Sequence, residues 1–322
     1  MSEDKPLKAV VDNISKVIVG KHESIFFATV ALLARGHLLI EDAPGLGKTM
    51  LARSMAKSLS VSYKRLQCTP DLMPSDVTGV PIFNDKTREF KFRPGPLFTN
   101  LLLVDEINRA TPRAQSALLE AMAEAQVSVD GKTYKLRKPF MVIATQNPIE
   151  NHGTYPLPEA QLDRFFMRIS LGYPTLTEEA EMMSMQRESH PINSLESVIK
   201  PKQILELQEK VSQIHVDNDV MRYIAAIAQK TREHESLSWG ASPRASLAMM
   251  RAAQAAAFIK GESYVDPSLV KLIAKPVLSH RIVVKPQMQV EQSADYIVTS
   301  ILDTVPVPVT INENIAWNPS AS

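Results

Sequence analysis

The sequence predicts an α/β protein in which a parallel sheet, covered by helices on both faces, precedes a smaller all-helical domain. Short apolar runs alternate with helical or loop patterns over the first 170 residues or so, which is typical of a parallel sheet. Helical patterns dominate the rest of the chain. The expected strands are 37–41, 63–67, 101–104, 141–144 and 169–171, of which 63–67 has the weakest pattern.

The pattern changes near Tyr173-Pro174, and a chain of 322 residues is long enough for two domains. We expect an α/β core over residues 1–172 and a helical domain over 173–310. Residues 311–322 are expected to form a tail, because chain ends of this kind are seldom packed.

Local signals predict where several helices begin. Thr111 can cap a helix whose first residue is Pro112. A second helix start is expected near Thr177, which three acidic residues follow closely. Ser242-Pro243 should open a long helix rich in alanine and methionine.

Two segments with alternating polarity interrupt the core and predict inserted hairpins. The first covers about 80–92, with a turn at Asn84-Asp85. The second covers about 127–136, where Asp130-Gly131 is a strong hairpin turn.

Composition narrows the class of protein. Hydrophobic residues make up 44% and charged residues 22% of the chain, as in soluble globular proteins. The chain has no apolar run of about 18 residues and no apolar signal core at its start, so a membrane span is not expected. The only cysteine is Cys68, and a cytoplasmic location is the expectation for a chain without disulfides. A net charge of +1 makes a dedicated nucleic-acid binder unlikely.

A phosphate-binding loop is predicted where the first strand meets the following helix. Gly45 and Gly47 allow backbone N–H groups to approach phosphate, and the helix N-terminus favours an anion. Lys48 would reach the β- and γ-phosphates of ATP, and the hydroxyl of Thr49 would hold Mg²⁺. The residues expected to contact ATP in this segment are Asp42, Ala43, Pro44, Gly45, Leu46, Gly47, Lys48, Thr49 and Met50. The alternative is an ordinary glycine-rich turn with a chance lysine.

Asp42 departs from the usual G-x-x-x-x-G-K-[ST] pattern, which has glycine at this position. Aspartate tolerates a left-handed backbone better than most residues do. We therefore expect the turn to survive this departure.

Two carboxylates follow the apolar run 101–104. Paired acids at the end of a buried strand are costly without a partner, and Mg²⁺ supplies one. Asp105 is expected to bind ATP-bound Mg²⁺ through water, and Glu106 to polarise the attacking water. The alternative is a solvated strand end. The phosphate loop about 60 residues earlier argues against this alternative, because the two motifs occur together in ATP-binding sites.

With these motifs the chain resembles the MoxR family of AAA+ ATPases. The resemblance is carried by APGLGKT (43–49), LLLVDEINRATPRAQSALLEAM (101–122), ATQNPIE (144–150), YPLPEAQLDRF (155–165) and GASPRASLAMM (240–250). It implies a P-loop AAA+ core with strand order 5-1-4-3-2 and a helical lid. It also implies ATP bound with Mg²⁺ at the interfaces of a homo-oligomeric ring, usually a hexamer. The implied role is chaperone-like remodelling of a protein client, often one with a von Willebrand factor A domain.

The resemblance assigns roles to further residues. Asn147 matches the first sensor, which orients the attacking water, although an amide there could merely cap the strand. Arg164 matches an arginine finger that reaches the neighbouring subunit's γ-phosphate, although a surface ion pair would also explain it. Arg244 matches the second sensor. Arg244 lies in the first turn of a helix, where the helix dipole disfavours a cation. A nearby phosphate would explain an arginine at this position, and the alternative is a solvated side chain.

Other positions leave two interpretations open. Val19 and Gly20 correspond to backbone that contacts adenine in the family, but an ordinary turn explains them equally well. Arg109 and Arg113 fit either a subunit interface or a solvated face.

The two hairpins resemble the helix-2 insert and the pre-sensor hairpin, which point toward the ring pore in this clade. The first carries Phe83, Phe90 and Phe92 with Lys86, Arg88 and Lys91. These aromatic rings could grip a partner or pack against the sheet. The second carries Lys132, Lys135, Arg137 and Lys138, which a solvated basic hairpin explains better than nucleic acid does.

Three other functions compete with this interpretation. A nucleic-acid motor of the same clade would need a basic channel, which a net charge of +1 does not favour. A magnesium-chelatase-like metal-insertion subunit would need a partner with a porphyrin site. A non-hydrolysing scaffold is disfavoured by the acid pair at 105–106.

Overall fold

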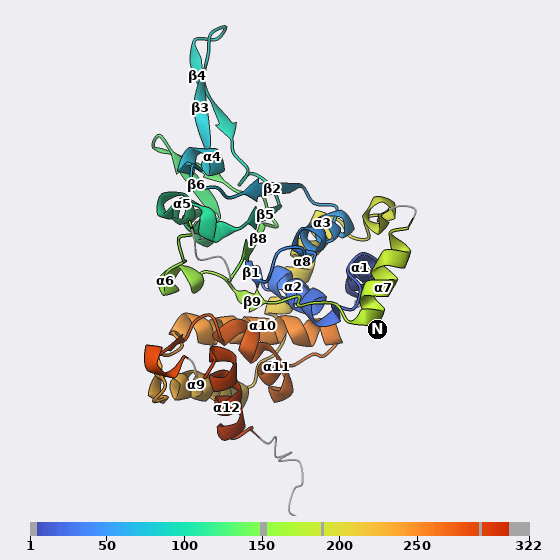
Figure 1. Ribbon diagram of the computed structural model, residues 1–322, viewed down its shortest axis with the longest axis vertical. Coiled ribbons are helices and arrows are strands. Elements are labelled where there is room, and N and C mark those ends of the chain that lie inside the picture. Colours follow the sequence, from blue (N-terminus) through green and yellow to red (C-terminus); the bar gives the residue numbers. More distant parts are fainter. Residues whose placement is uncertain (1–4, 149–152, 188–189, 290–291, 309–322) are drawn as a thin grey trace, which may run out of the picture.

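The computed structural model describes residues 5–148, 153–187, 190–289 and 292–308 (Figure 1). The predicted tail at 311–322 lies outside these residues. Among the described helices, none combines the length and apolar character needed to cross a membrane.

A five-stranded parallel sheet forms the centre of the core. Its strands are β1 (Leu38–Glu41), β2 (Tyr63–Gln67), β5 (Leu101–Asp105), β8 (Met141–Gln146) and β9 (Met167–Ile169). They lie in the order β2-β5-β8-β1-β9, and every pairing is parallel. Counted along the sheet strands alone, this order is 5-1-4-3-2, so the predicted sheet is confirmed. The last strand ends at Ile169, two residues before the expected end at Leu171.

Helices cover both faces of the sheet. One face packs on α1 (Lys5–Ser15), α2 (His22–Leu33) and α3 (Lys48–Ser58); the other packs on α4 (Pro74–Thr78), η1 (Ile107–Arg109) and α5 (Pro112–Glu124) (Figure 1). Leu38 and Ile40 belong to the first of these two apolar clusters, and Leu39 between them belongs to the second. Alternation along a strand places successive side chains on opposite faces, and both faces are covered here, which is why residues 38–40 of β1 are all apolar. The hydroxyl of Thr111 caps α5 as predicted.

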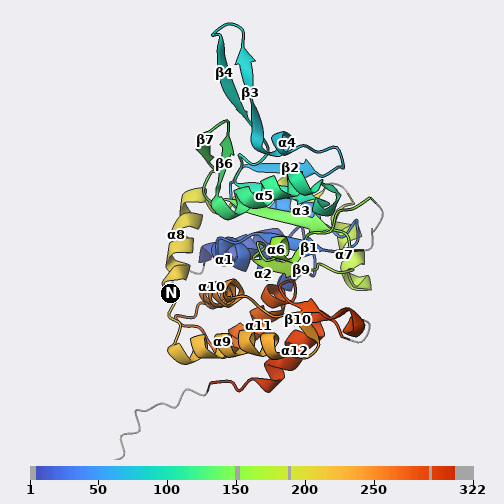
Figure 2. The same cartoon turned by 90° about the vertical axis from the view of Figure 1, so that its left-hand side faces the viewer.

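Both predicted hairpins are present. Strands β3 (Gly79–Asn84) and β4 (Glu89–Pro94) form a long ribbon that projects from the core (Figure 2). Strands β6 (Gln126–Val129) and β7 (Lys132–Lys135) form a shorter one. At the second turn both Asp130 and Gly131 have positive φ, which the Asp-Gly pair allows.

Within the described part of the chain, six helices and two short 3₁₀ turns follow β9. They are α7 (Leu176–Met185), η2 (Pro191–Ser194), α8 (Pro201–Ser212), α9 (Asn218–Glu233), α10 (Pro243–Lys260), α11 (Pro267–Leu278), η3 (Pro286–Met288) and α12 (Ala294–Thr304); α6 (Glu159–Leu162) precedes β9. Helix α10 begins after Ser242, as predicted. Helix α7 begins earlier than expected, because the Thr175 hydroxyl rather than Thr177 caps it.

The lid is helical but not entirely so. Strands β10 (Leu237–Trp239) and β11 (Val283–Val284) pair antiparallel between its helices. The expectation of an all-helical lid was therefore wrong in this detail: a strand of two or three residues is too short for its pattern to be seen.

The segment from η2 to α8 packs on the core. Lys57 donates to the backbone oxygen of Ile192, and Gln208 donates to that of Leu32. The division of the chain at residue 173 stays a prediction.

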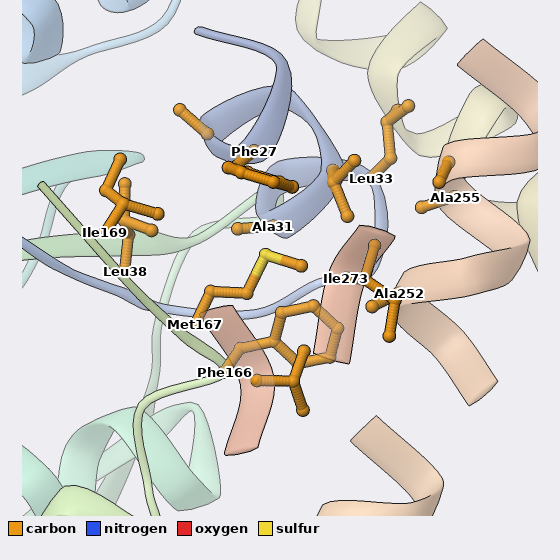
Figure 3. Packing of buried hydrophobic residues seen from close by; sticks show 14 of the residues in the cluster. Phe27, Ala31, Leu33, Leu38, Phe166, Met167, Ile169, Ala252, Ala255 and Ile273 are labelled. Atoms are coloured by element: carbon orange, nitrogen blue, oxygen red, sulfur yellow. The ribbon is translucent and has the colours of Figure 1, made fainter. Parts of the chain in front are cut away.

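Core and lid share one apolar cluster. Figure 3 shows Ala252 and Ile273 of the lid beside Phe166. Phe27 and Ala31 of α2 belong to the same cluster, and Met167 lies between Ala31 and Phe166. Because small side chains line α10 there, its backbone can approach the core closely. The lid is thus placed next to β9, at the edge of the sheet.

Candidate functional site

The predicted phosphate loop has the geometry of an anion cradle. Gly45 and Gly47 have φ of +85° and +87°, a backbone conformation that residues other than glycine rarely adopt. A Cβ placed on either glycine would meet no described atom within 4 Å. Helix α3 starts directly after Gly47, and no described side chain caps its N-terminus. Free space and unused N–H groups at a helix start fit phosphate.

Lys48 lies under this loop. Its Nζ donates to the backbone oxygens of Asp42, at 2.7 Å, and Ala43, at 3.2 Å. Burial lowers the pKa of Lys48, while the nearby Asp42, Asp105 and Glu106 oppose that shift. The ammonium group is thereby held beside the cradle, among the acids of the site.

Asp42 has structural contacts that its sequence position did not predict. Its φ is not positive, so the turn does not need a left-handed residue at this position. The residue is 7% exposed, and its carboxylate accepts hydrogen bonds from Ser170 Oγ at 2.7 Å and from the N–H groups of Leu171 and Gly172. The side chain therefore ties the end of β1 to the segment after β9, and a direct contact of Asp42 with ATP stays a prediction.

Asp105 lies at the carboxyl end of β5, which is separated from β1 by the single strand β8. Its Oδ1 accepts from Thr145 Oγ1 at 2.6 Å, and its Oδ2 accepts from Arg65 Nη2 at 2.6 Å. Thr145 and Arg65 were not predicted from the sequence. The strand order alone could have pointed to them, because β2 and β8 lie on either side of β5 in the sheet.

Glu106 has a strained backbone. Its φ of +56° is left-handed, which costs a residue with a side chain about 1–2 kcal/mol. The N–H of Glu106 donates to Thr145 Oγ1 at 2.9 Å, and its Oε2 meets Gln67 Nε2 at 3.0 Å and Arg109 Nε at 3.2 Å. Strain of this kind concentrates at active sites, where neighbouring groups hold it. The contact with Arg109 is within the subunit, so the proposed interface role of that arginine remains untested.

The acids and the cradle suit Mg²⁺ bound together with a nucleotide. Among the described residues, no group of three or more His, Cys, Asp or Glu side chains could hold a metal alone. Mg²⁺ ordinarily uses one or two protein ligands, with phosphates and waters completing its shell. Thr49, in the first turn of α3, and Asp105 are the side chains that would hold it.

Asn147 directly follows β8, which lies between β5 and β1. The side chain is 7% exposed. The carboxyl ends of parallel strands meet at one edge, so its backbone lies between Glu106 and the phosphate loop. This position suits the predicted sensor.

Arg164 and Arg244 lie together, away from the phosphate loop. They line a cavity of about 390 Å³ with Gly36 and His37, which precede β1. The loop follows β1. At about 3.3 Å per residue, the extended path from His37 to Ala43 spans roughly 20 Å. The structure thus divides the predicted site into two groups, at opposite ends of the sheet.

Each of these two arginines has a contact within its own subunit. Arg164 Nη1 donates to the backbone oxygen of Leu119 at 3.0 Å, and Arg244 Nη1 donates to Asp163 Oδ2 at 3.2 Å. Both side chains are largely exposed. Arg35, Arg251 and Arg281 also line the cavity, so it is strongly basic.

Helix α7 covers the Val19-Gly20 segment. A Cβ on Gly20 would lie 1.9 Å from Glu178 Oε1, and Lys21 Nζ donates to the backbone oxygen of Tyr173 at 2.8 Å. Adenine contact at Val19 and Gly20 stays a prediction, and it must accommodate the Glu178 side chain.

The aromatic residues of the first hairpin divide into two kinds. Phe90 is 73% exposed, and its ring lies edge-on to Phe83 on the paired strand. Phe92 stacks on Tyr134 of β7, with ring centroids 4.1 Å apart, and meets Phe98 edge-on. Phe92 therefore joins the two hairpins, whereas Phe90 faces solvent.

This division predicts different effects of the same substitution. Phe92→Ala should lose at least the stabilisation of an aromatic pair, about 0.5–1.5 kcal/mol. Phe90→Ala should lower the free energy of unfolding less, because its ring is 73% exposed and its edge-on pair with Phe83 lies at the surface. Urea unfolding of both variants measures this, and equal losses would contradict the packing described.

Comparisons with known proteins agree with this geometry. Residues 37–167 match the family model described as "ATPase family associated with various cellular activities (AAA)", and residues 229–301 match an AAA lid domain. A crystal structure of a protein assigned as an ATPase, from Cytophaga hutchinsonii, superposes with a TM-score of 0.89 and 35% identity, covering 95% of this chain and 96% of the other.

Two relatives extend over nearly the full length. YeaC of Bacillus subtilis (strain 168) is 50% identical, covering 94% of this chain and 95% of that protein. Chaperone MoxR1 of Mycobacterium tuberculosis is 38% identical, covering 95% of this chain and 84% of that protein. With the phosphate loop, the acid pair and the lid in one chain, these likenesses lead to one conclusion. The chain belongs to the MoxR family of AAA+ ATPases.

Proposed function

We propose that this chain hydrolyses ATP at the interfaces of a homo-oligomeric ring, a hexamer, and uses the energy to remodel a protein client in the cytoplasm. The observation that carries the proposal is the separation of two half-sites. The cradle, the acid pair and Asn147 lie at the carboxyl end of the sheet, whereas Arg164 and Arg244 lie at the amino end. A side chain at one end cannot reach a phosphate at the other within one subunit. A second copy placed head to tail brings the two together.

The residues at the carboxyl end prepare ATP for attack. Lys48 and the start of α3 would hold the β- and γ-phosphates, and Thr49 and Asp105 would hold Mg²⁺, which when bound would neutralise charge that develops as ADP leaves. Glu106 takes a proton from the attacking water. Asn147 orients that water beside it.

Arg164 and Arg244 then serve the neighbouring subunit. Both lie beside one cavity, so one γ-phosphate inserted there would meet both guanidinium groups. They would offset the charge that develops on the transferred phosphoryl group. Arg244 therefore acts on the neighbour's ATP together with Arg164.

The client is a protein bound in part by the tip of the first hairpin. Its exposed apolar residues, Phe83, Phe90 and Ile82, have the character of an interaction surface. A chaperone role is consistent with the printed name of the mycobacterial relative. A von Willebrand factor A domain protein is the client class we propose.

A capture experiment tests the client. Glu106→Gln protein with ATP should retain a client that Glu106→Gln/Phe90→Ala protein retains much less, because the second variant lacks the exposed ring. Glu106→Gln/Lys48→Ala protein should retain none, because Lys48 supplies a charge for the phosphates that the backbone cannot replace. Equal retention by all three variants would show that capture needs neither ATP nor the hairpin.

A further inference from the structure

The segment that carries Arg164 is fixed from two sides. From the core, the His37 backbone oxygen accepts from the N–H of Phe166 at 2.8 Å. From the lid, Arg281 Nη2 donates to the Phe165 oxygen at 2.6 Å, and Nη1 donates to the Phe166 oxygen at 3.1 Å. His280 Nε2 bonds the Phe165 oxygen at 3.0 Å, and since a carbonyl only accepts, this nitrogen is the donor.

One carboxylate links this lid arginine to Arg244. Asp163 Oδ1 accepts from Arg281 Nε at 2.9 Å, and Asp163 Oδ2 accepts from Arg244 Nη1 at 3.2 Å. Asp163 directly precedes Arg164. The backbone of Arg164 and the side chain of Arg244 are therefore both positioned by groups that Arg281 contacts.

Burial of the charged Arg281 side chain at this position is energetically unfavourable. Its side chain is 3% exposed, and burial lowers its pKa to about 10, with Asp163 opposing the shift. The group is still charged at neutral pH. A buried ion pair is seldom more stable than well-packed apolar residues of the same volume. Stability alone is thus a weak reason for a guanidinium here, and its four hydrogen-bond partners fix geometry instead: Asp163, Phe165, Phe166 and Val277.

We propose that Arg281 is a positioning residue for catalysis in the neighbouring subunit, holding Arg164 and Arg244 at the angle at which one γ-phosphate meets both. This inference rests on the proposed action of the two arginines across the interface. It makes the lid a part of the catalytic machinery, because Arg281 belongs to the lid and the segment that it holds belongs to the core.

The first test is Arg281→Lys, which keeps the charge but loses the planar fork. Misplacement of a catalytic group by about 1 Å costs on the order of 100-fold in rate. We expect kcat to fall about 10- to 100-fold while KM for ATP stays within about twofold, since the cradle is at the other end of the sheet. The control is Arg232→Lys, another lid arginine that donates to a backbone oxygen, that of Ala241, and does not touch this segment. A kcat unchanged in Arg281→Lys would overturn the proposal.

Mixing experiments separate positioning from a structural role. Arg281→Lys chains mixed with Glu106→Gln chains should recover activity, because some interfaces pair an intact Glu106 with an intact Arg281 from the next subunit. Arg281→Lys mixed with Arg164→Ala should not recover, since both defects lie on the same side of the interface. Recovery in the second mixture, or none in the first, would overturn the positioning role.

A parallel mixture of Arg164→Ala with Glu106→Gln distinguishes the two levels of inference. If it recovers and the Arg281→Lys mixture does not, positioning is wrong and the proposed function stands. If neither recovers in rings that exchange subunits, the action across the interface is wrong and positioning falls with it.

A second variant covers the case in which Arg281→Lys does not fold. Asp163→Asn changes a partly exposed side chain, keeps its shape and weakens both of its ion pairs. The same loss of kcat, constant KM and recovery with Glu106→Gln are expected. Full kcat in a folded Asp163→Asn ring would contradict the proposal.

Discussion

Glu106→Gln should bind ATP normally and hydrolyse it about 100- to 10,000-fold more slowly than the parent protein. The amide keeps the shape of the side chain and can still accept a hydrogen bond from Gln67 or Arg109, but it cannot take a proton from water. The cradle around Lys48 is untouched. Steady-state phosphate release measures the rate, and calorimetric titration with ATP measures the affinity.

Glu120→Gln is the matched control for this variant. Glu120 lies on the exposed face of α5, and its substitution should leave both quantities unchanged. With hydrolysis blocked, the Glu106→Gln ring should also stay assembled with ATP, which light scattering detects. If Glu106→Gln released phosphate at the parent rate, the general base would have to be another group.

Arg164→Ala should lower the hydrolysis rate about 1,000- to 100,000-fold, as expected for a finger that another subunit supplies. The loss should leave ATP affinity intact, because the cradle lies at the far end of β1. Arg222→Ala is the control: it is an exposed arginine that does not line the basic cavity.

The origin of the arginine is tested by mixing two inactive proteins. Rings built from Glu106→Gln and Arg164→Ala chains contain some interfaces with an intact Glu106 facing an intact Arg164. Activity should therefore pass through a maximum at intermediate mixing ratios. No recovery at any ratio, in rings shown to exchange subunits, would place the action of Arg164 within its own subunit.

The sequence was sufficient where local geometry depends on neighbours along the chain. The phosphate loop was recognisable because strand, glycines and helix start follow one another within a dozen residues. The same holds for Asp105 and Glu106, which end a strand, and for the Asp130-Gly131 turn, whose conformation is local.

The sequence was insufficient where a side chain meets a distant partner. Asp42 was judged by the backbone its position usually needs, yet its carboxylate bonds residues about 130 positions later. Arg65 and Thr145 contact Asp105 only because β2 and β8 flank β5. The shared place of Arg164 and Arg244 likewise follows from how the lid packs beside β9, which no periodicity encodes.

If Arg164 and Arg244 act across the interface as proposed, the placement of the two half-sites at opposite ends of one sheet makes activity depend on the concentration of the chain. On that proposal a lone chain can hold ATP at Lys48, but its own Arg164 and Arg244 lie at the other end of the sheet. The rate per chain should therefore rise as subunits associate and level off once rings are saturated. By mass action, a client or nucleotide that stabilises the ring would raise hydrolysis without touching a catalytic group. Dilution would have the opposite effect and leave subunits that bind ATP but do not hydrolyse it.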